Sequence, residues 1–246
     1  MTLLYLVLAG LVAGFVNALA GGGTFVIFPA LLFAGLASVK ANATASLVVV
    51  PGGITIAWVY RRTLVGQPIG LVLQLLTVSL AGSLVGSLLL LNTANATFST
   101  LVPWLLLIAA TVFTAAPWLR SAASKAAGHK SMPVLFVGQF IVTVYGGYFG
   151  AGMGVMMIAL FLAAGNMDIQ SASCLRVICA TSVNLLATLL FAFRGAIEWK
   201  PGIPMLLATI AGGYVGARLV RRMNDKTARN AILVYAWVLT AYFFIR

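Results

Sequence analysis

The chain has 246 residues, of which 62% are hydrophobic and only 7% charged, and its mean hydropathy is +1.10. Charge-free runs of 39 and 57 residues exceed the roughly 17–25 apolar residues of a membrane-spanning helix, and they lack the ~10-residue alternation of a membrane β-barrel. The net charge of +12 comes from Lys and Arg near the ends of these runs, which favours lipid headgroups as partners over nucleic acid. We therefore predict an all-α, polytopic helical membrane protein.

Glycine-rich segments interrupt two long charge-free stretches. Residues 17–24 (NALAGGGT) interrupt the first, and residues 145–154 (YGGYFGAGMG) interrupt the second, about 130 positions later. Such a break frees backbone groups that hydrocarbon cannot satisfy, so it must lie within protein or line a polar cavity. We predict helical pieces on both sides of each break, at 3–20, 24–37, 133–149 and 153–165.

Three ordinary spans follow each broken element. We expect them at 42–60, 68–91 and 98–117 in the first half and at 170–193, 201–219 and 229–245 in the second. A polar segment between the halves is expected at residues 120–132. The predicted organisation is a first membrane repeat (1–119), a cytoplasmic connector (120–132) and a second membrane repeat (133–246), all within one integral membrane domain.

A nearly constant spacing relates the two halves and predicts a duplication. The glycine-rich breaks align at a spacing of 129, residues 81–87 align with 211–217 at 130, and residues 41–44 align with 172–175 at 131. The pair at a spacing of 130 shares a Gly-xxx-Gly pattern, which allows two helices to approach closely. The glycines concerned are Gly82, Gly86, Gly212 and Gly216.

The positions of Lys and Arg indicate how the broken elements sit. If each crossed the membrane once, these residues would divide eight to six between the two sides, whereas a return to the side of entry divides them ten to four. Cytoplasmic loops carry an excess of Lys and Arg, which favours the second arrangement. The halves are then inverted, both termini face outside, and the connector faces the cytoplasm. The count leaves a re-entrant hairpin and two full crossings open, but the short segments 24–37 and 153–165 favour the hairpin.

Inverted hairpins would bring their tips together near the middle of the membrane. Each tip begins a half-helix, whose amino end carries about half a positive charge and presents free N–H groups to an anion. Glycine lets the backbone come close to such a ligand. Polar side chains flank the tips, among them Asn17 and Thr24 at the first break and Thr44, Ser46 and Asn184 in the spans that follow.

Arg176 is the one ionisable residue clearly inside an apolar span. Burying a charged side chain in a membrane is costly, at roughly 3 kcal/mol or more. A fixed positive charge beside an anion site would explain it. The alternative is that Arg176 extends its side chain to the headgroups from a position close to the start of its span.

No residue pattern points to a cofactor or an enzymatic reaction. Cys174, Cys179 and His129 cannot form a zinc or haem site, and residues 150–154 lack the strand and acidic residue of a dinucleotide-binding loop. Asp168, Glu198 and Asp225 fall near span ends, so no carboxylate is expected to carry protons within the membrane. We therefore expect no cofactor, no metal and no enzyme activity.

Several of these motifs, in this order, resemble the TauE/SafE sulfite-exporter family. The matching segments cover essentially the whole chain: residues 14–24, 29–32, 41–46, 147–154, 191–199 and 212–219, together with Asn184. The resemblance implies a multi-pass permease of the bacterial inner (cytoplasmic) membrane that moves sulfite or another sulfur-containing anion or organosulfonate. It also implies site residues at Asn17, Gly21, Gly22, Gly23, Thr44, Ser46, Gly150, Gly152 and Asn184. The chain departs from the family's pattern at residues 43–46 (ATAS), where Gly-Thr-Ser is common, and at Arg176, where Lys is expected.

The predicted function is a secondary transporter that moves a small anion by alternating access. The alternatives are a passive anion channel and a membrane subunit of a partner complex that transports nothing itself. The anion, the direction of flux, the coupling ion and the oligomeric state stay open at this point. The predicted substrate-binding residues are Asn17, Gly21, Gly22, Gly23, Thr24, Thr44, Ser46, Gly150, Gly152, Gly154, Arg176 and Asn184.

Overall fold

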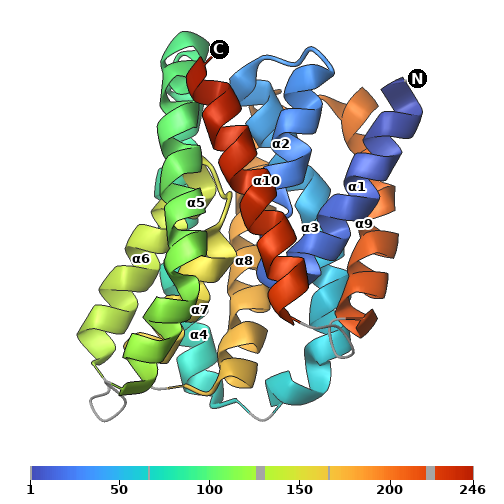
Figure 1. Cartoon of the computed structure of the whole chain (residues 1–246). Helices are drawn as coiled ribbons and strands as arrows, with labels where there is room; N and C mark the ends of the chain where they lie inside the picture. Colours follow the sequence, from blue (N-terminus) through green and yellow to red (C-terminus); the bar gives the residue numbers. More distant parts are fainter. Residues whose placement is uncertain (1, 66, 126–130, 166, 220–224, 246) are drawn as a thin grey trace.

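A computed structural model describes residues 2–65, 67–125, 131–165, 167–219 and 225–245. The regular structure in this part of the chain is entirely α-helical (Figure 1). The helices are α1 (Thr2–Ala20), α2 (Thr24–Phe33), α3 (Ser38–Val65), α4 (Ile69–Leu91), α5 (Asn95–Lys125), α6 (Met132–Tyr148), α7 (Met153–Ala163), α8 (Ile169–Phe193), α9 (Trp199–Leu219) and α10 (Asp225–Ile245). The predicted fold class is confirmed.

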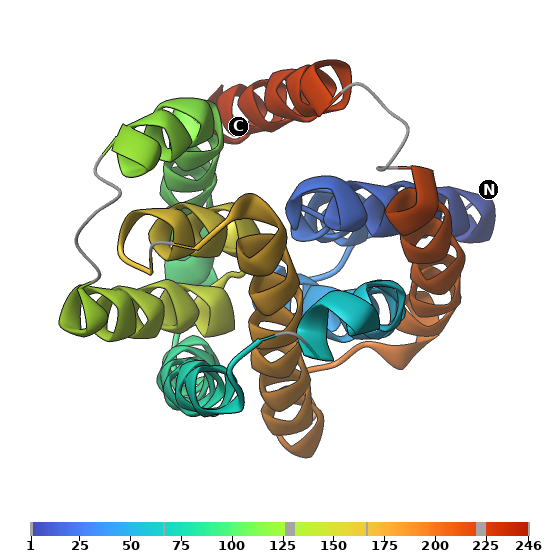
Figure 2. The same ribbon diagram turned by 90° about the horizontal axis from the view of Figure 1, so that it is seen from below.

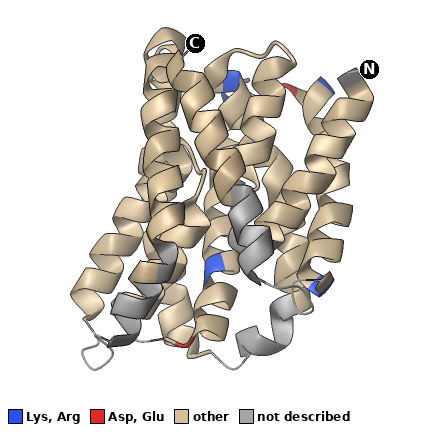
Figure 3. Cartoon of the chain, viewed as in Figure 1, with Lys and Arg blue, Asp and Glu red and all other residues tan. Residues whose placement is uncertain are grey.

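The described helices fit a membrane. Five segments are long and apolar enough to cross it, namely Ser38–Val59, Ile69–Leu91, Asn95–Val112, Ile169–Phe193 and Trp199–Leu219. A helix satisfies all of its interior backbone groups within itself, which hydrocarbon demands. Figure 3 shows that most charged positions in the described part of the chain lie at the two ends of the bundle. The chain is a multi-pass membrane protein.

The two broken elements are hairpins that enter from opposite ends of the bundle. Helix α1 runs inward from the end where both termini lie, and α2 returns to that end (Figure 1). Helices α6 and α7 make the same excursion from the opposite end. Each hairpin thus returns to the end from which it enters, as the Lys and Arg positions favour. Five helices follow the same order in each half, which fits two inverted repeats, although the duplication itself stays a prediction.

Several helix boundaries differ from those expected, and two of these differences concern the first hairpin and the connector. Helix α2 ends at Phe33 rather than continuing to residue 37, because Gly35 adopts a φ of +91°. The N–H of Gly35 donates to the carbonyl of Leu32 (2.9 Å) and that of Leu36 to the carbonyl of Leu31 (3.1 Å), a pattern that closes a helix. Helix α5 continues to Lys125, so part of the expected connector, residues 120–132, is helical.

Each hairpin packs against a span of the other half. Helix α1 lies along α9, and α6 lies along α4 (Figure 2). A Cβ atom on Gly212 would collide with the carbonyl oxygen of Leu11, and one on Gly86 with that of Val144. The Gly-xxx-Gly patterns therefore do allow close helix contact, and the two halves interlock.

Buried hydroxyl groups tie the spans together between these contacts. Ser83 of α4 donates to the carbonyl of Val183 in α8 (2.8 Å), and Thr209 of α9 donates to that of Val48 in α3 (2.8 Å). All of the side chains that donate are buried. Helix α8 is thus bonded to α4, helix α3 is bonded to α9, and α3 and α8 pack on each other.

We predict that Gly86→Ala and Gly212→Ala each destabilise the protein by about 1–3 kcal/mol, because the added methyl group meets a backbone carbonyl that cannot move aside. The midpoint of thermal unfolding in detergent would measure the loss. Gly70→Ala is the matched control on α4, since its Cβ would meet nothing within 4 Å. Equal midpoints for all three variants would contradict the close packing.

Candidate functional site

The two breaks meet each other inside the bundle. Gly21, in the first break, has a φ of +71°, and a Cβ built on it would lie 3.0 Å from Cα of Gly154, in the first turn of α7. The same Cβ would lie 2.5 Å from Nη1 of Arg176. The backbone at Gly21, the backbone at Gly154 and the guanidinium group of Arg176 are therefore in contact. A residue with a Cβ atom at position 21 would leave too little room for this contact.

Glycines shape both breaks. The N–H of Gly21 still donates to the carbonyl of Asn17 (2.9 Å), and the bonds of α2 begin with the N–H of Phe25 to the carbonyl of Gly22 (3.0 Å). Gly150 and Gly152 adopt φ values of +80° and +77° before α7 begins. In the first turns, the N–H groups of Phe25 and Val26 donate to the carbonyls of Gly22 and Gly23, and those of Met153 and Val155 donate to the carbonyls of Gly150 and Gly152. Only the remaining N–H groups of the two breaks are candidates for binding a ligand.

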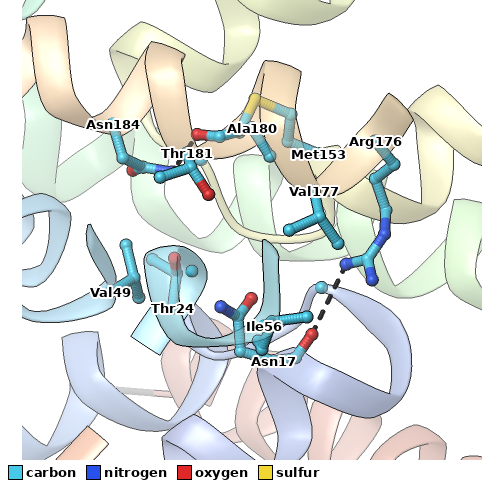
Figure 4. Close-up of a pocket in the computed structure, with 13 residues that line it drawn as sticks. Asn17, Thr24, Val49, Ile56, Met153, Arg176, Val177, Ala180, Thr181 and Asn184 are labelled. Atoms are coloured by element: carbon cyan, nitrogen blue, oxygen red, sulfur yellow. Dashed lines mark hydrogen bonds between the residues drawn. The ribbon is translucent and has the colours of Figure 1, made fainter. Parts of the chain in front are cut away.

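A cavity of about 20 Å³ lies where the breaks meet α3 and α8 (Figure 4). Such a volume has room for about one water molecule. Its lining consists of Asn17, Gly21, Thr24, Val49, Gly53, Ile56, Gly150, Met153, Arg176, Val177, Ala180, Thr181 and Asn184. Three of the polar side chains come from α8, and the others from α1 and α2.

Neutral polar groups gather on one side of the cavity. A Cβ on Gly150 would lie 3.9 Å from Oγ1 of Thr24 and 4.0 Å from Oδ1 of Asn184, so both side chains face the second break. Asn184 also donates from Nδ2 to the carbonyl of Ala180 (2.8 Å). The hydroxyl of Thr181 packs against Gly53 of α3. The cavity thus has hydroxyl and amide groups beside glycine backbone.

Arg176 turns toward the protein interior. Its residue surface is only 4% exposed, and Nη1 donates to the carbonyl of Asn17 over 3.4 Å (Figure 4). This burial does not fit a side chain that extends to the headgroups. An arginine keeps its charge at any physiological pH, so the cavity has a permanent positive wall.

The start of α8 is fixed two turns before Arg176. Asp168 caps the helix, accepting hydrogen bonds from the N–H groups of Gln170 (2.9 Å) and Ser171 (3.0 Å). Hydrogen bonds from Ser171 hold the pKa of the Asp168 carboxyl below its usual value. A carboxylate at a helix amino end is also favoured by the helix dipole.

Six of the twelve predicted binding residues line the cavity: Asn17, Gly21, Thr24, Gly150, Arg176 and Asn184. Four more belong to the breaks but not to the lining: Gly22, Gly23, Gly152 and Gly154. Thr44 lies elsewhere, where its hydroxyl oxygen accepts the N–H of Glu198 (3.0 Å). The hydroxyl of Ser46 donates within its own helix to the carbonyl of Asn42 (3.3 Å).

Seven lining residues were not in the predicted set: Val49, Gly53, Ile56, Met153, Val177, Ala180 and Thr181. Most are apolar and carry no chemical signal of a site. The spacing between the halves would have found some of them. Gly53 stands 131 positions before Asn184, and Val49 stands 131 before Ala180. At the breaks, Thr24 and Met153 are related by the spacing of 129.

A comparison with protein families decides the identity of the fold. The model of the sulfite exporter TauE/SafE family matches residues 6–243. The chain belongs to this family. A "Probable membrane transporter protein" of Haemophilus influenzae is 30% identical over 94% of this chain and 90% of its own length. A "Probable membrane transporter protein YfcA" of Escherichia coli K12 is 26% identical over 94% and 85%. Like its family, the chain is a membrane transporter.

We predict that Gly21→Ala destabilises the protein more than Gly35→Ala. Both glycines have a positive φ, which costs an alanine about 1–2 kcal/mol, but nothing lies within 4 Å of a Cβ on Gly35. At Gly21 the methyl group must also displace Arg176 or the backbone of Gly154. Thermal unfolding midpoints of the two variants in detergent give the comparison. Equal losses would mean that the two breaks do not touch.

Proposed function

We propose that this TauE/SafE protein is a secondary transporter that binds a small anion where its two breaks meet. The observation that carries this proposal is the position of Arg176, whose guanidinium group lies against both Asn17 and Gly21 at the wall of the cavity. A charged side chain buried in a membrane protein is costly, and such residues commonly mark a binding site for a charged ligand.

The remaining groups suit an oxyanion. Hydroxyl groups of Thr24 and Thr181 and the side-chain amides of Asn17 and Asn184 can donate hydrogen bonds to the oxygen atoms of an anion. An arginine can hold two oxygen atoms of one anion at once. The name of the family favours sulfite or another sulfur-containing anion, including organosulfonates, as the substrate class.

The size of the cavity and the order of the helices support alternating access as the mechanism. Room for about one water molecule is too little for a four-atom oxyanion, so the walls must separate before one enters. The hairpins come from opposite ends of the bundle, and opening would occur on one side at a time as the halves rock. A duplicated chain, with repeats at 1–119 and 133–246, would supply the two rocking units.

The distribution of Lys and Arg supports one orientation of the protein in the membrane. The hairpin arrangement is the one for which the sequence divides Lys and Arg ten to four. We propose that the end bearing the termini faces outside the cytoplasmic membrane of a bacterial cell, and that the segment between α5 and α6 is cytoplasmic.

We predict that Arg176→Gln raises the half-saturating anion concentration about tenfold or more in proteoliposomes, because a charged hydrogen-bond donor is lost. The half-saturating concentration of Arg176→Lys, which keeps the charge, should lie between those of the unchanged protein and Arg176→Gln. Arg194→Gln is the matched control, since Arg194 is exposed beyond the other end of α8. Sulfite, sulfate, thiosulfate and sulfonates form the test panel, and unaltered kinetics in a well-folded Arg176→Gln protein would remove Arg176 from the site.

A carrier and a channel predict different fluxes. We expect saturable uptake that accelerates when the same anion is present inside the liposome, because a carrier returns faster when loaded. A flux that rises linearly with concentration and ignores internal anion would indicate a channel instead. Purified protein that moves no member of the panel would indicate a subunit that needs a partner.

A further inference from the structure

We propose that the site selects anions that carry a single negative charge and rejects those that carry two. This inference rests on the anion-transport function proposed above and adds the charge of the substrate to it. It follows from a count of the charges around the cavity, both formal and partial.

Arg176 is the one lining residue in the described part of the chain that carries a formal charge. No acidic side chain is among the lining residues. Of the carboxylates whose side chains the structure describes, Asp168 caps α8 and Glu198 pairs with Lys40 at 2.6 Å. The formal charge of the lining side chains is therefore +1.

The half-helix dipoles add little to this charge, because each break joins a carboxyl end to an amino end. Helix α1 ends at Ala20 where α2 begins at Thr24, and α6 ends at Tyr148 where α7 begins at Met153. A helix end carries about half a unit of charge, positive at the amino end and negative at the carboxyl end. The two partial charges of each break cancel to first order, although their N–H groups still donate.

The side chain of Arg176 is hydrogen-bonded to the carboxyl end of α1. Its Nη1 donates to the carbonyl of Asn17, in the last turn of that helix. A carbonyl group is neutral, so this bond does not change the formal charge of the guanidinium group. The group therefore holds the first break in place and also places a positive charge beside the cavity.

The net charge of the occupied site then depends on the anion. A monoanion beside Arg176 gives a sum of zero, whereas a dianion leaves one negative charge in a buried, low-dielectric place. Charges interact several times more strongly there than in water, and an uncompensated buried charge is strongly unfavourable. Size does not distinguish the two cases when the anions have the same shape.

Methanesulfonate and sulfate make the test sharp. Both anions have a tetrahedral sulfur atom, but in methanesulfonate a methyl group replaces one oxygen of sulfate. At neutral pH methanesulfonate therefore carries one negative charge and sulfate carries two. Labelled methanesulfonate uptake into proteoliposomes is measured while unlabelled anions compete. We expect an inhibition constant for sulfate at least about tenfold above that for methanesulfonate, equivalent to about 1.4 kcal/mol. Comparable constants would overturn the inference while leaving anion transport intact, and the absence of any uptake would overturn both proposals.

A second positive charge in the cavity wall should change this preference. Met153 lines the cavity and is buried, and an arginine keeps its charge even when it is buried. Met153→Arg is expected to narrow the gap between the inhibition constants of the two anions at least about threefold, since the wall then carries two charges. Met153→Gln is the uncharged control and should keep the gap. A gap that narrows equally in both variants, or in neither, would contradict selection by charge.

Discussion

A backbone amide without a partner cannot face hydrocarbon, and this constraint organises the whole protein. Two glycine-rich segments break their helices, so their free groups must be covered by protein. Each break is covered by the other, since Gly21 lies against Gly154, and by α8, which contributes Arg176. The neighbouring spans then have to close around these hairpins, which explains the glycine contacts of α1 with α9 and of α6 with α4.

The scaffold is nearly symmetric, but its chemistry is not. Helices α3 and α8 occupy equivalent places in the order of their halves, and both line the cavity. Helix α8 supplies Arg176, Thr181 and Asn184, whereas α3 supplies Val49, Gly53 and Ile56. Helix α8 therefore contributes most of the polar side chains of the lining, whereas α3 contributes an apolar wall.

Much of this fold was predictable because lipid leaves few choices. Long apolar runs must be helices, and Gly21 and Gly150 mark the breaks at which the structure has its hairpins. Helix ends were harder, since Gly35 closes α2 through backbone bonds that composition does not reveal. Of the predicted binding residues, several beside a break line the cavity, whereas Thr44 and Ser46 do not, because a hydroxyl looks the same in the sequence whether it faces a ligand or a backbone group. Apolar lining residues such as Ile56 leave no trace in a single sequence.

The contact of α1 with α9 has a consequence for biosynthesis. Helix α1 can meet its glycine-matched partner α9 only after about 180 further residues have been made. Until then the glycine-bearing face of α1 lacks this partner, and its break must be sheltered by the insertion machinery, by water or by other neighbours. Assembly of this molecule therefore depends on a pairing between segments far apart in the chain, and such pairings slow folding in general.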